Sequence, residues 1–360
     1  MKKFYTIFCV TTTIFAMSCT SIQEGKQMQG WDEDWQLFGN VKSVTINRKG
    51  VDSDGVEVED VIRYKFNNRG DVAKKTIDMY GRFNVGAYSE MYKYKYDFAG
   101  NMVECVWSVP DSSRKYKKVW KYDSSGNIIE ESVYYSDGTL GEKITYKYDT
   151  AGNVVEKVTY GFDGSITDKY ISKYNSVGNM VAESWYKSSG LLYRECTYEY
   201  DSVGYLIVQN NRNVLLSLQD KTIYKYDTEG HRVEVVEYNT DDVLVVRDVF
   251  AYDEMGNKIE EARYDSCDSL LVKYAYKYDA KGNLLEQVRY SGSGSPIGKY
   301  IWMYDSNGNK VEYTHYDGTG MLHNRHVWVY DSMGNLLEEN FYKSKDMILE
   351  SSTEVEIIYR

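Results

Sequence analysis

Apolar and polar residues alternate along most of the chain, and the alternation recurs at a fixed interval. A tyrosine opens the same short phrase every 26 residues. Asp or Asn follows each of these tyrosines, and Gly stands four residues after it. A fixed period of this length is typical of repeat proteins, in which one supersecondary unit is stacked many times. The repeat anchors are Tyr96, Tyr122, Tyr148, Tyr174, Tyr200, Tyr226, Tyr252, Tyr278, Tyr304 and Tyr330.

One repeat divides into two strands and two turns. Asp123 to Gly126 predicts a turn, because the aspartate can accept backbone hydrogen bonds and the glycine can adopt the left-handed conformation that closes it. Residues 128–134 predict a strand, residues 136–138 a second turn, and residues 140–148 a second strand. The repeat is therefore expected to be a β-hairpin that another turn joins to the next hairpin.

The alternation places the aromatic side chains of a repeat on one face of the sheet. Trp120 and Tyr122 are two residues apart and share a face, whereas Lys121 points to the other face. No segment has the apolar spacing of a helix that could cover the aromatic face, so the sheet must coil until this face lines an inside. We predict an all-β fold of tandem 26-residue β-hairpin repeats that form one long, coiled antiparallel sheet, either a spiral or a rolled open barrel.

Two charged columns leave the register of the hairpins open. Glutamates recur eight residues after the anchors, as at Glu130, and basic residues recur twenty-one residues after them, as at Lys143. If the second loop holds four residues, these two side chains lie opposite each other as an ion pair. If it holds three residues with a glycine bulge, Glu130 lies among the aromatic side chains and can accept hydrogen bonds from tyrosine hydroxyls. Gly at the fourth turn position favours the bulged alternative.

The start of the chain predicts export and a membrane anchor. Residues 1–18 have a positively charged start and a short apolar run, as a signal peptide of lipoprotein type does. Residues 16–19 resemble a bacterial lipobox, so Cys19 is expected to be lipidated; ordinary cleavage after Ser18, with plain secretion, is the alternative. Residues 19–38 predict a lipidated tether and an N-terminal cap. Residues 39–360 predict the repeat domain, with about 11 repeats.

The composition narrows the function classes. The 360-residue chain has a net charge of −11, which argues against a nucleic-acid partner because phosphates need a basic face. Cys105, Cys196 and Cys267 stand at different places in their repeats, so no disulfide framework is expected. No nucleotide-binding or catalytic-triad motif occurs in the sequence, and no cofactor is expected.

The repeated phrase resembles the YD repeat of the RHS family, which reads Tyr-Asp-x-x-Gly followed by Arg or Asn and an aliphatic residue. Residues 122–128 show the phrase in full, and the resemblance covers about residues 64 to 359. It implies repeats that wind into a hollow β-shell, as in the large bacterial toxins and animal adhesion proteins of that family. The chain is too short to enclose a toxin domain. It therefore looks like a short RHS/YD-repeat bacterial lipoprotein of the cell envelope, on the periplasmic or surface side of the outer membrane.

A few side chains are candidates for binding. Trp107, Trp185 and Phe341 occupy the same repeat position, eleven residues after the anchor, and form a sugar- or protein-binding patch if that face is outward. If it is inward, they pack under the curl of the sheet. His315 and His323 are expected to be cross-strand partners under the three-residue loop and are weak candidates for metal ligands, because a closed site needs further ligands.

These features favour a non-enzymatic envelope lipoprotein that presents a repetitive β-surface to a partner protein or a glycan. A carbohydrate-binding accessory lipoprotein that uses exposed Trp and Tyr side chains is the alternative. A hydrolase is disfavoured, because adjacent carboxylates such as Glu130 and Glu131 point to opposite faces of a strand. The expected partners are an envelope protein or glycan and, through the N-terminal lipid, the membrane.

Overall fold

The computed structural model describes residues 37–51, 56–81, 88–110, 112–343 and 348–360. The predicted signal peptide, the lipidation site at Cys19 and nearly all of the predicted tether lie outside these residues. The described residues form strands joined by turns. None of them belongs to a helix that is long and apolar enough to span a membrane.

The strands follow the 26-residue phase along the whole repeat region. Their bounds are β1 (Val41–Val51), β2 (Glu57–Phe66), β3 (Val72–Tyr80), β4 (Tyr88–Tyr96), β5 (Met102–Ser108), β6 (Lys115–Tyr122), β7 (Ile128–Tyr134), β8 (Leu140–Tyr148), β9 (Val154–Tyr160), β10 (Ile166–Tyr174), β11 (Met180–Lys187), β12 (Leu192–Tyr200), β13 (Leu206–Asn213), β14 (Leu218–Tyr226), β15 (Arg232–Tyr238), β16 (Leu244–Tyr252), β17 (Lys258–Asp265), β18 (Leu270–Tyr278), β19 (Leu284–Ser291), β20 (Pro296–Tyr304), β21 (Lys310–Asp317), β22 (Leu322–Tyr330), β23 (Leu336–Lys343) and β24 (Ile348–Tyr359).

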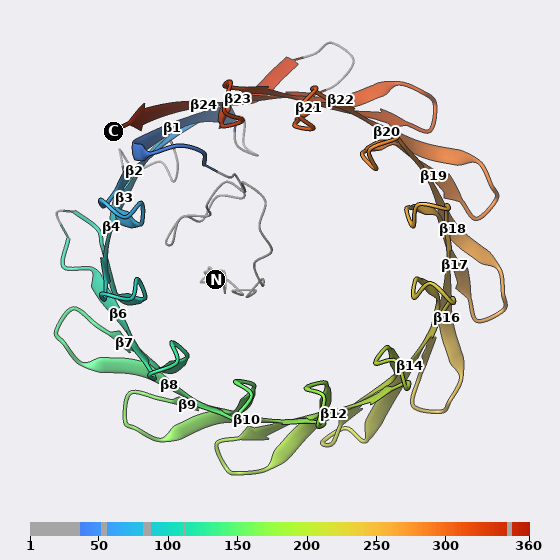
Figure 1. Ribbon diagram of the computed structural model, residues 1–360, viewed down its shortest axis with the longest axis horizontal. Helices are drawn as coiled ribbons and strands as arrows, with labels where there is room; N and C mark the ends of the chain where they lie inside the picture. Colours follow the sequence, from blue (N-terminus) through green and yellow to red (C-terminus); the bar gives the residue numbers. More distant parts are fainter. Residues whose placement is uncertain (1–36, 52–55, 82–87, 111, 344–347) are drawn as a thin grey trace, which may run out of the picture.

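The sheet closes on itself. Each strand pairs antiparallel with the next one along the chain, and β1 also pairs antiparallel with β24, so that Ile46 faces Val355 across the seam. Figure 1 shows the resulting ring, in which the first and last strands lie side by side. The all-β rolled sheet is confirmed, but the expected open edge is wrong. Twist brings the two end strands together, and their pairing satisfies backbone groups that an open edge would leave unpaired.

The Asp–Gly turns form as the sequence predicts. The amide of Gly126 donates to the carbonyl of Asp123 over 3.2 Å, and Gly126 has a φ of 87°. The carboxylate of Asp123 accepts from the amides of Ser125 and Asn127, at 2.8 and 2.9 Å. The side chain of Asn127 donates to the same carboxylate over 3.0 Å. The Asp-to-Asn pair therefore fixes the turn from both sides, and these turns gather toward the inside of the ring in Figure 1.

The second turn resolves the register question, with one correction. The amide of Gly138 donates to the carbonyl of Tyr135 and the amide of Tyr135 donates to the carbonyl of Thr139, which is the three-residue loop. However, Glu130 does not lie among the aromatic side chains. A second bulge follows, because the register shifts between Val133 and Tyr134. This extra residue returns Glu130 to the lysine face, where it pairs with Lys121 over 2.9 Å.

The aromatic face lines the inside of the ring. Val44, Ile46 and Tyr64 on β1 and β2 are buried in one cluster with Leu37, which belongs to the segment that enters β1 along the inner side of the ring (Figure 1). Cross-strand partners share a face. Tyr64 is opposite Lys75, Lys75 is opposite Tyr92, and Tyr92 is opposite Trp107. The face that carries Trp107 is therefore continuous with the buried inner cluster.

Candidate functional site

The anchor tyrosines tie each hairpin to the one before it. The hydroxyl of Tyr122 donates to the carbonyl of Met102 over 2.7 Å, and the hydroxyl of Tyr148 donates to the carbonyl of Ile128 over the same distance. Burial raises the pKa of both phenols. The same bond recurs at Tyr174, Tyr200, Tyr226, Tyr252, Tyr278, Tyr304 and Tyr330. These residues hold the repeats together, as their role as anchors predicts.

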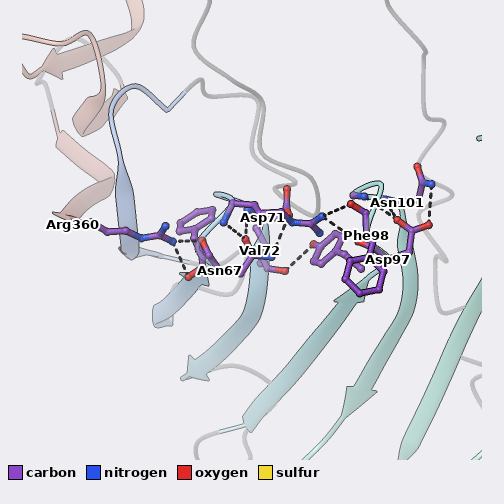
Figure 2. Close-up of polar contacts among 11 residues, drawn as sticks. Asn67, Asp71, Val72, Asp97, Phe98, Asn101 and Arg360 are labelled. Carbon is purple, nitrogen blue, oxygen red and sulfur yellow. Dashed lines mark hydrogen bonds and ion pairs between the residues drawn. The ribbon is translucent and has the colours of Figure 1, made fainter.

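The turns at the seam are joined by backbone carbonyls and arginines. Figure 2 shows Arg360 directed at the turn that begins at Asn67, where its guanidinium donates to the carbonyls of Phe66 and Asn67. One repeat further on, Arg69 donates to the carbonyl of Asp97 over 3.1 Å. Tyr96 reaches the carbonyl of Val72 over 2.8 Å. This rim is a structural network, in which Arg360 links the end of β24 to the turn after β2.

The three candidate aromatic side chains share the inner face but not one patch. Trp107 is on β5, Trp185 on β11 and Phe341 on β23, so they belong to different sectors of the ring. Each is half-buried against a neighbouring ring: Trp107 lies 5.0 Å from Tyr116 between ring centroids, Trp185 lies 5.3 Å from Tyr170, and Phe341 lies 4.4 Å from His326. The outward patch considered from the sequence does not form.

Carboxylates on the inner face pair with phenols, a feature that the sequence analysis missed. Glu131 accepts from the hydroxyl of Tyr146 over 2.7 Å and pairs with Lys118. Burial acts to raise the pKa of Glu131, but the hydrogen bonds from Lys118 and Tyr146 outweigh it and lower the pKa. Glu183 and Glu261 accept from the hydroxyls of tyrosines in the same way. The signal in the sequence is a polar residue nine positions after the anchor, one position beyond the glutamate column.

The outer face carries a ladder of ion pairs. Glu156 lies between Lys147, at 2.7 Å, and Lys169, at 2.6 Å. Glu286 lies in the same way between Lys277 and Lys299. Hydrogen bonds from the lysines lower the pKa of both glutamates. Glu130 and Glu131 thus point to opposite faces, as the alternation of a strand predicts, and no convergent pair of carboxylates arises from them.

The two candidate histidines are in contact. The rings of His315 and His323 meet edge to face, with 5.1 Å between their centroids. The backbone register pairs His315 with Asn324 and leaves His323 in the bulge, so the expected direct pairing is off by one residue. Burial and the neighbouring His323 lower the pKa of His315. Among the described residues, no group of three or more His, Cys, Asp or Glu side chains could hold a metal ion.

The cysteines of the repeat region remain unpaired. Cys105 is half-buried, Cys196 is buried and Cys267 is exposed, and each is a free thiol in the part of the chain that the structure describes. Burial raises the pKa of the Cys105 thiol to about 11, which keeps it protonated near neutral pH. The thiols of Cys105 and Cys196 therefore behave as small packing groups.

The likenesses of the chain to known proteins lie among solved structures. No protein-family model matches it, and no curated protein does. Among solved structures, a chain of TcdB2-TccC3-TEV matches 86% of this chain at 10% identity with a TM-score of 0.22, and this chain spans 27% of the length of that one. A porin-like protein from Bacteroides uniformis matches 88% of this chain and 98% of its own length, at 9% identity with a TM-score of 0.25.

A porin-like protein from Bacteroides vulgatus matches 80% of this chain and 98% of its own length, at 11% identity with a TM-score of 0.21. Likenesses at these TM-scores carry no argument about what this chain does. Membership of the RHS family therefore stays a prediction that rests on the repeated phrase itself.

Proposed function

We propose that the protein is a non-enzymatic binding protein of the bacterial cell envelope that holds a partner protein or a glycan against the inner face of its ring. One observation carries the proposal. The sheet closes through β1 and β24 with its aromatic face inward, and a barrel of 24 strands is too wide for its own side chains to fill. A large, concave and partly aromatic surface is thus available to a partner.

The placement in the envelope rests on the sequence. A lipid on Cys19 would hold the ring at a membrane, and the short RHS/YD-repeat lipoprotein is the family type that the repeated phrase supports. The alternative, a carbohydrate-binding accessory lipoprotein, is favoured by the half-buried Trp107 and Trp185, because such rings stack against the apolar faces of sugars. A catalytic role is not part of the proposal, since the inner carboxylates of Glu131 and Glu183 are engaged with phenols, and Glu131 also with Lys118.

Affinity capture from native envelopes tests this function. The tagged wild-type protein is compared with the double variant Trp107→Ala, Trp185→Ala, and a further variant, Cys19→Ser, is assayed for incorporation of labelled palmitate. We expect one partner that the wild-type protein retains and the double variant loses, and no lipid on the Cys19→Ser variant. Equal capture by both folded proteins would contradict the use of the inner face, and a lipidated Cys19→Ser variant would contradict the anchor.

A further inference from the structure

The inner face of strands β18 to β22 has a charge unlike that of the chain as a whole. The net charge of the protein is −11. The two glutamates of these strands point to the outer face, where Glu286 pairs with Lys277 over 2.8 Å and Glu312 pairs with Arg325 over 2.6 Å. Asp317, at the end of β21, is the acidic residue on the inner side of these strands, and its carboxylate accepts from the amides of its own turn. Within these strands the inner face therefore carries little negative charge, and the glutamates that reach it from the flanking strands, Glu261 and Glu339, accept from Tyr276 and Trp328.

Arg289 is the side chain that makes this sector unusual. One repeat earlier, Arg263 stands at the same repeat position, and Asp248 on the preceding strand holds it through two bonds of 2.7 Å. The residue opposite Arg289 is Tyr274 instead of an aspartate. Arg289 is exposed, and among the described residues it has neither an ion pair nor a hydrogen bond. A guanidinium without a partner on a concave face is available to an anion.

Aromatic residues share the inner face with this arginine: Tyr274 is its register partner on one side, and Tyr300 stands two residues beyond Gly298, its partner on the other. Tyr300 stacks on His315 with 4.4 Å between centroids and 10° between planes. Trp302 lies 5.5 Å from Tyr313. All four are half-buried, so part of each ring faces the inside of the barrel. They form a platform on which a flat apolar surface can stack.

The residue that faces Arg289 across the strand pair, beside these rings, is a glycine. Gly298 is opposite Arg289 on one side and opposite Asp317 on the other. A Cβ at Gly298 would stand in ordinary contact with both rings, 3.6 Å from His315 Nε2 and 3.6 Å from Tyr300 Oη. Gly298 is buried, so these rings cover the glycine and place an imidazole and a hydroxyl beside the strand that faces the free guanidinium, where they can exchange hydrogen bonds.

We infer that this part of the inner face binds an acidic oligosaccharide, with a sugar carboxylate on Arg289 and sugar faces on the platform of Tyr300, Trp302 and Tyr313. This deepens the proposed function and rests on it. A sugar acid matches the site because it combines one negative charge with apolar C–H faces and hydroxyl edges. A nucleic acid matches it less well, since one free arginine in a chain of net charge −11 cannot neutralise a run of phosphates.

Isothermal titration of the folded protein with a galacturonic acid hexamer tests the inference, with the methyl ester of the same hexamer as the uncharged counterpart. We expect the acid to bind, added salt to weaken it, and the ester to bind about tenfold more weakly or worse. Arg289→Gln is expected to weaken the acid by a similar factor. Gly298→Leu, whose side chain would displace the rings of Tyr300 and His315 that cover the glycine, is expected to weaken binding as well.

Arg194→Gln is the matched control, because Arg194 is also exposed on the inner face but lies on β12 over the ring of Trp185, 4.8 Å from its centroid. It is expected to bind as the wild-type protein does. Equal affinities for the acid and the ester, or an unchanged affinity in Arg289→Gln, would overturn the inference. So would binding of a thymidine oligonucleotide in place of the hexamer. If the partner captured from envelopes depends on Trp107 and Trp185 while the hexamer does not bind, this inference fails and the proposed function stands.

Discussion

Replacing Asn335 with Ala is expected to weaken the closure of the ring far more than the equivalent change in an inner repeat. Asn335 follows the Asp331 turn, is fully buried, and lies where the chain before β1 meets the end of β24. Its side chain accepts from the amide of Phe38 at 2.6 Å and donates to the carbonyl of Phe38 at 3.2 Å, to Tyr359 Oη at 2.8 Å and to Asp331 at 3.0 Å. One side chain therefore connects the turn with both ends of the sheet.

The neighbouring repeat supplies the control. Asn309 has the same place in its turn, but its side chain makes one bond, to Asp305 at 2.9 Å. The Nδ2 group has two hydrogens for its three acceptors, so Asn335 makes about two more net hydrogen bonds than Asn309. At about 1 kcal/mol for each net bond, Asn335→Ala should lower the free energy of unfolding by about 2 kcal/mol more than Asn309→Ala.

Urea unfolding, followed by tryptophan fluorescence, measures this difference. The free energies of unfolding are compared only if the slope of free energy against urea concentration is the same in both variants. A different slope would indicate a change in the unfolded ensemble. Two variants that lose the same free energy would refute the reasoning, because they would show that the buried contacts at the seam add nothing to an ordinary turn.

Further expectations concern the anchors, the turns and the outer ladder. Tyr148→Phe removes the bond to the carbonyl of Ile128 and should lower the free energy of unfolding in urea by about 1 kcal/mol. Tyr134→Phe should lower it less, because the ring of Tyr134 lies under Lys117 on the outer face. Equal losses would contradict the role of the anchor hydroxyl. Hydrogen bonds from Asn153 and from turn amides lower the pKa of Asp149 in the folded state, and those from Asn283 do the same for Asp279. These aspartates therefore stabilise the folded protein above the unfolded pKa of about 4. That stabilisation is lost as the pH falls through the folded pKa. Replacing these aspartates with Asn, which already occupies this place at Asn175 and accepts the same amides, should flatten the acid side of the stability curve, and an unchanged curve would count against it. Lys147→Gln should matter less in high salt than in low salt, because its bond to Glu156 is solvent-exposed; an effect independent of salt would speak against an ion-pair role.

The repeated phrase predicted the turns and the two faces because both depend on local chemistry. Asp123, Gly126 and Asn127 contain all the groups that close their turn, so the sequence was sufficient there. The alternation of Trp120, Lys121 and Tyr122 likewise determined which side chains lie together. Hence the aromatic inner face and the lysine outer face follow from the pattern.

The second bulge and the closure could not be predicted in the same way. The bulged position after the second turn holds Gly141 in one hairpin and His323 in another, so no residue type marks it. The bulge places Glu130 on the lysine face, whereas the three-residue loop alone would have placed it among the aromatic side chains. The strands that close the ring, β1 and β24, lie outside the 26-residue phase, and their pairing is a contact between the two ends of the chain.

The candidate site was predicted in part. The aromatic side chains at Trp107, Trp185 and Phe341 were identified from one repeat position, but their direction depends on how the sheet rolls. Arg289 carried no signal, because Arg263 has the same repeat position and a different environment. The two arginines differ in the residue opposite each: Asp248 faces and binds Arg263, whereas Tyr274 faces Arg289.

A disulfide across the seam tests the closed ring most directly. Thr45 on β1 is the register partner of Glu356 on β24, so cysteines at these two positions, in a Cys267→Ser background, should form an intramolecular bond under mild oxidation. The account predicts a nearly complete cross-link in the monomer, together with a rise in the urea midpoint. A sheet that coils as an open spiral would keep these two strands apart, and a monomer in which both thiols stay free would contradict the closure from which the inner binding face follows.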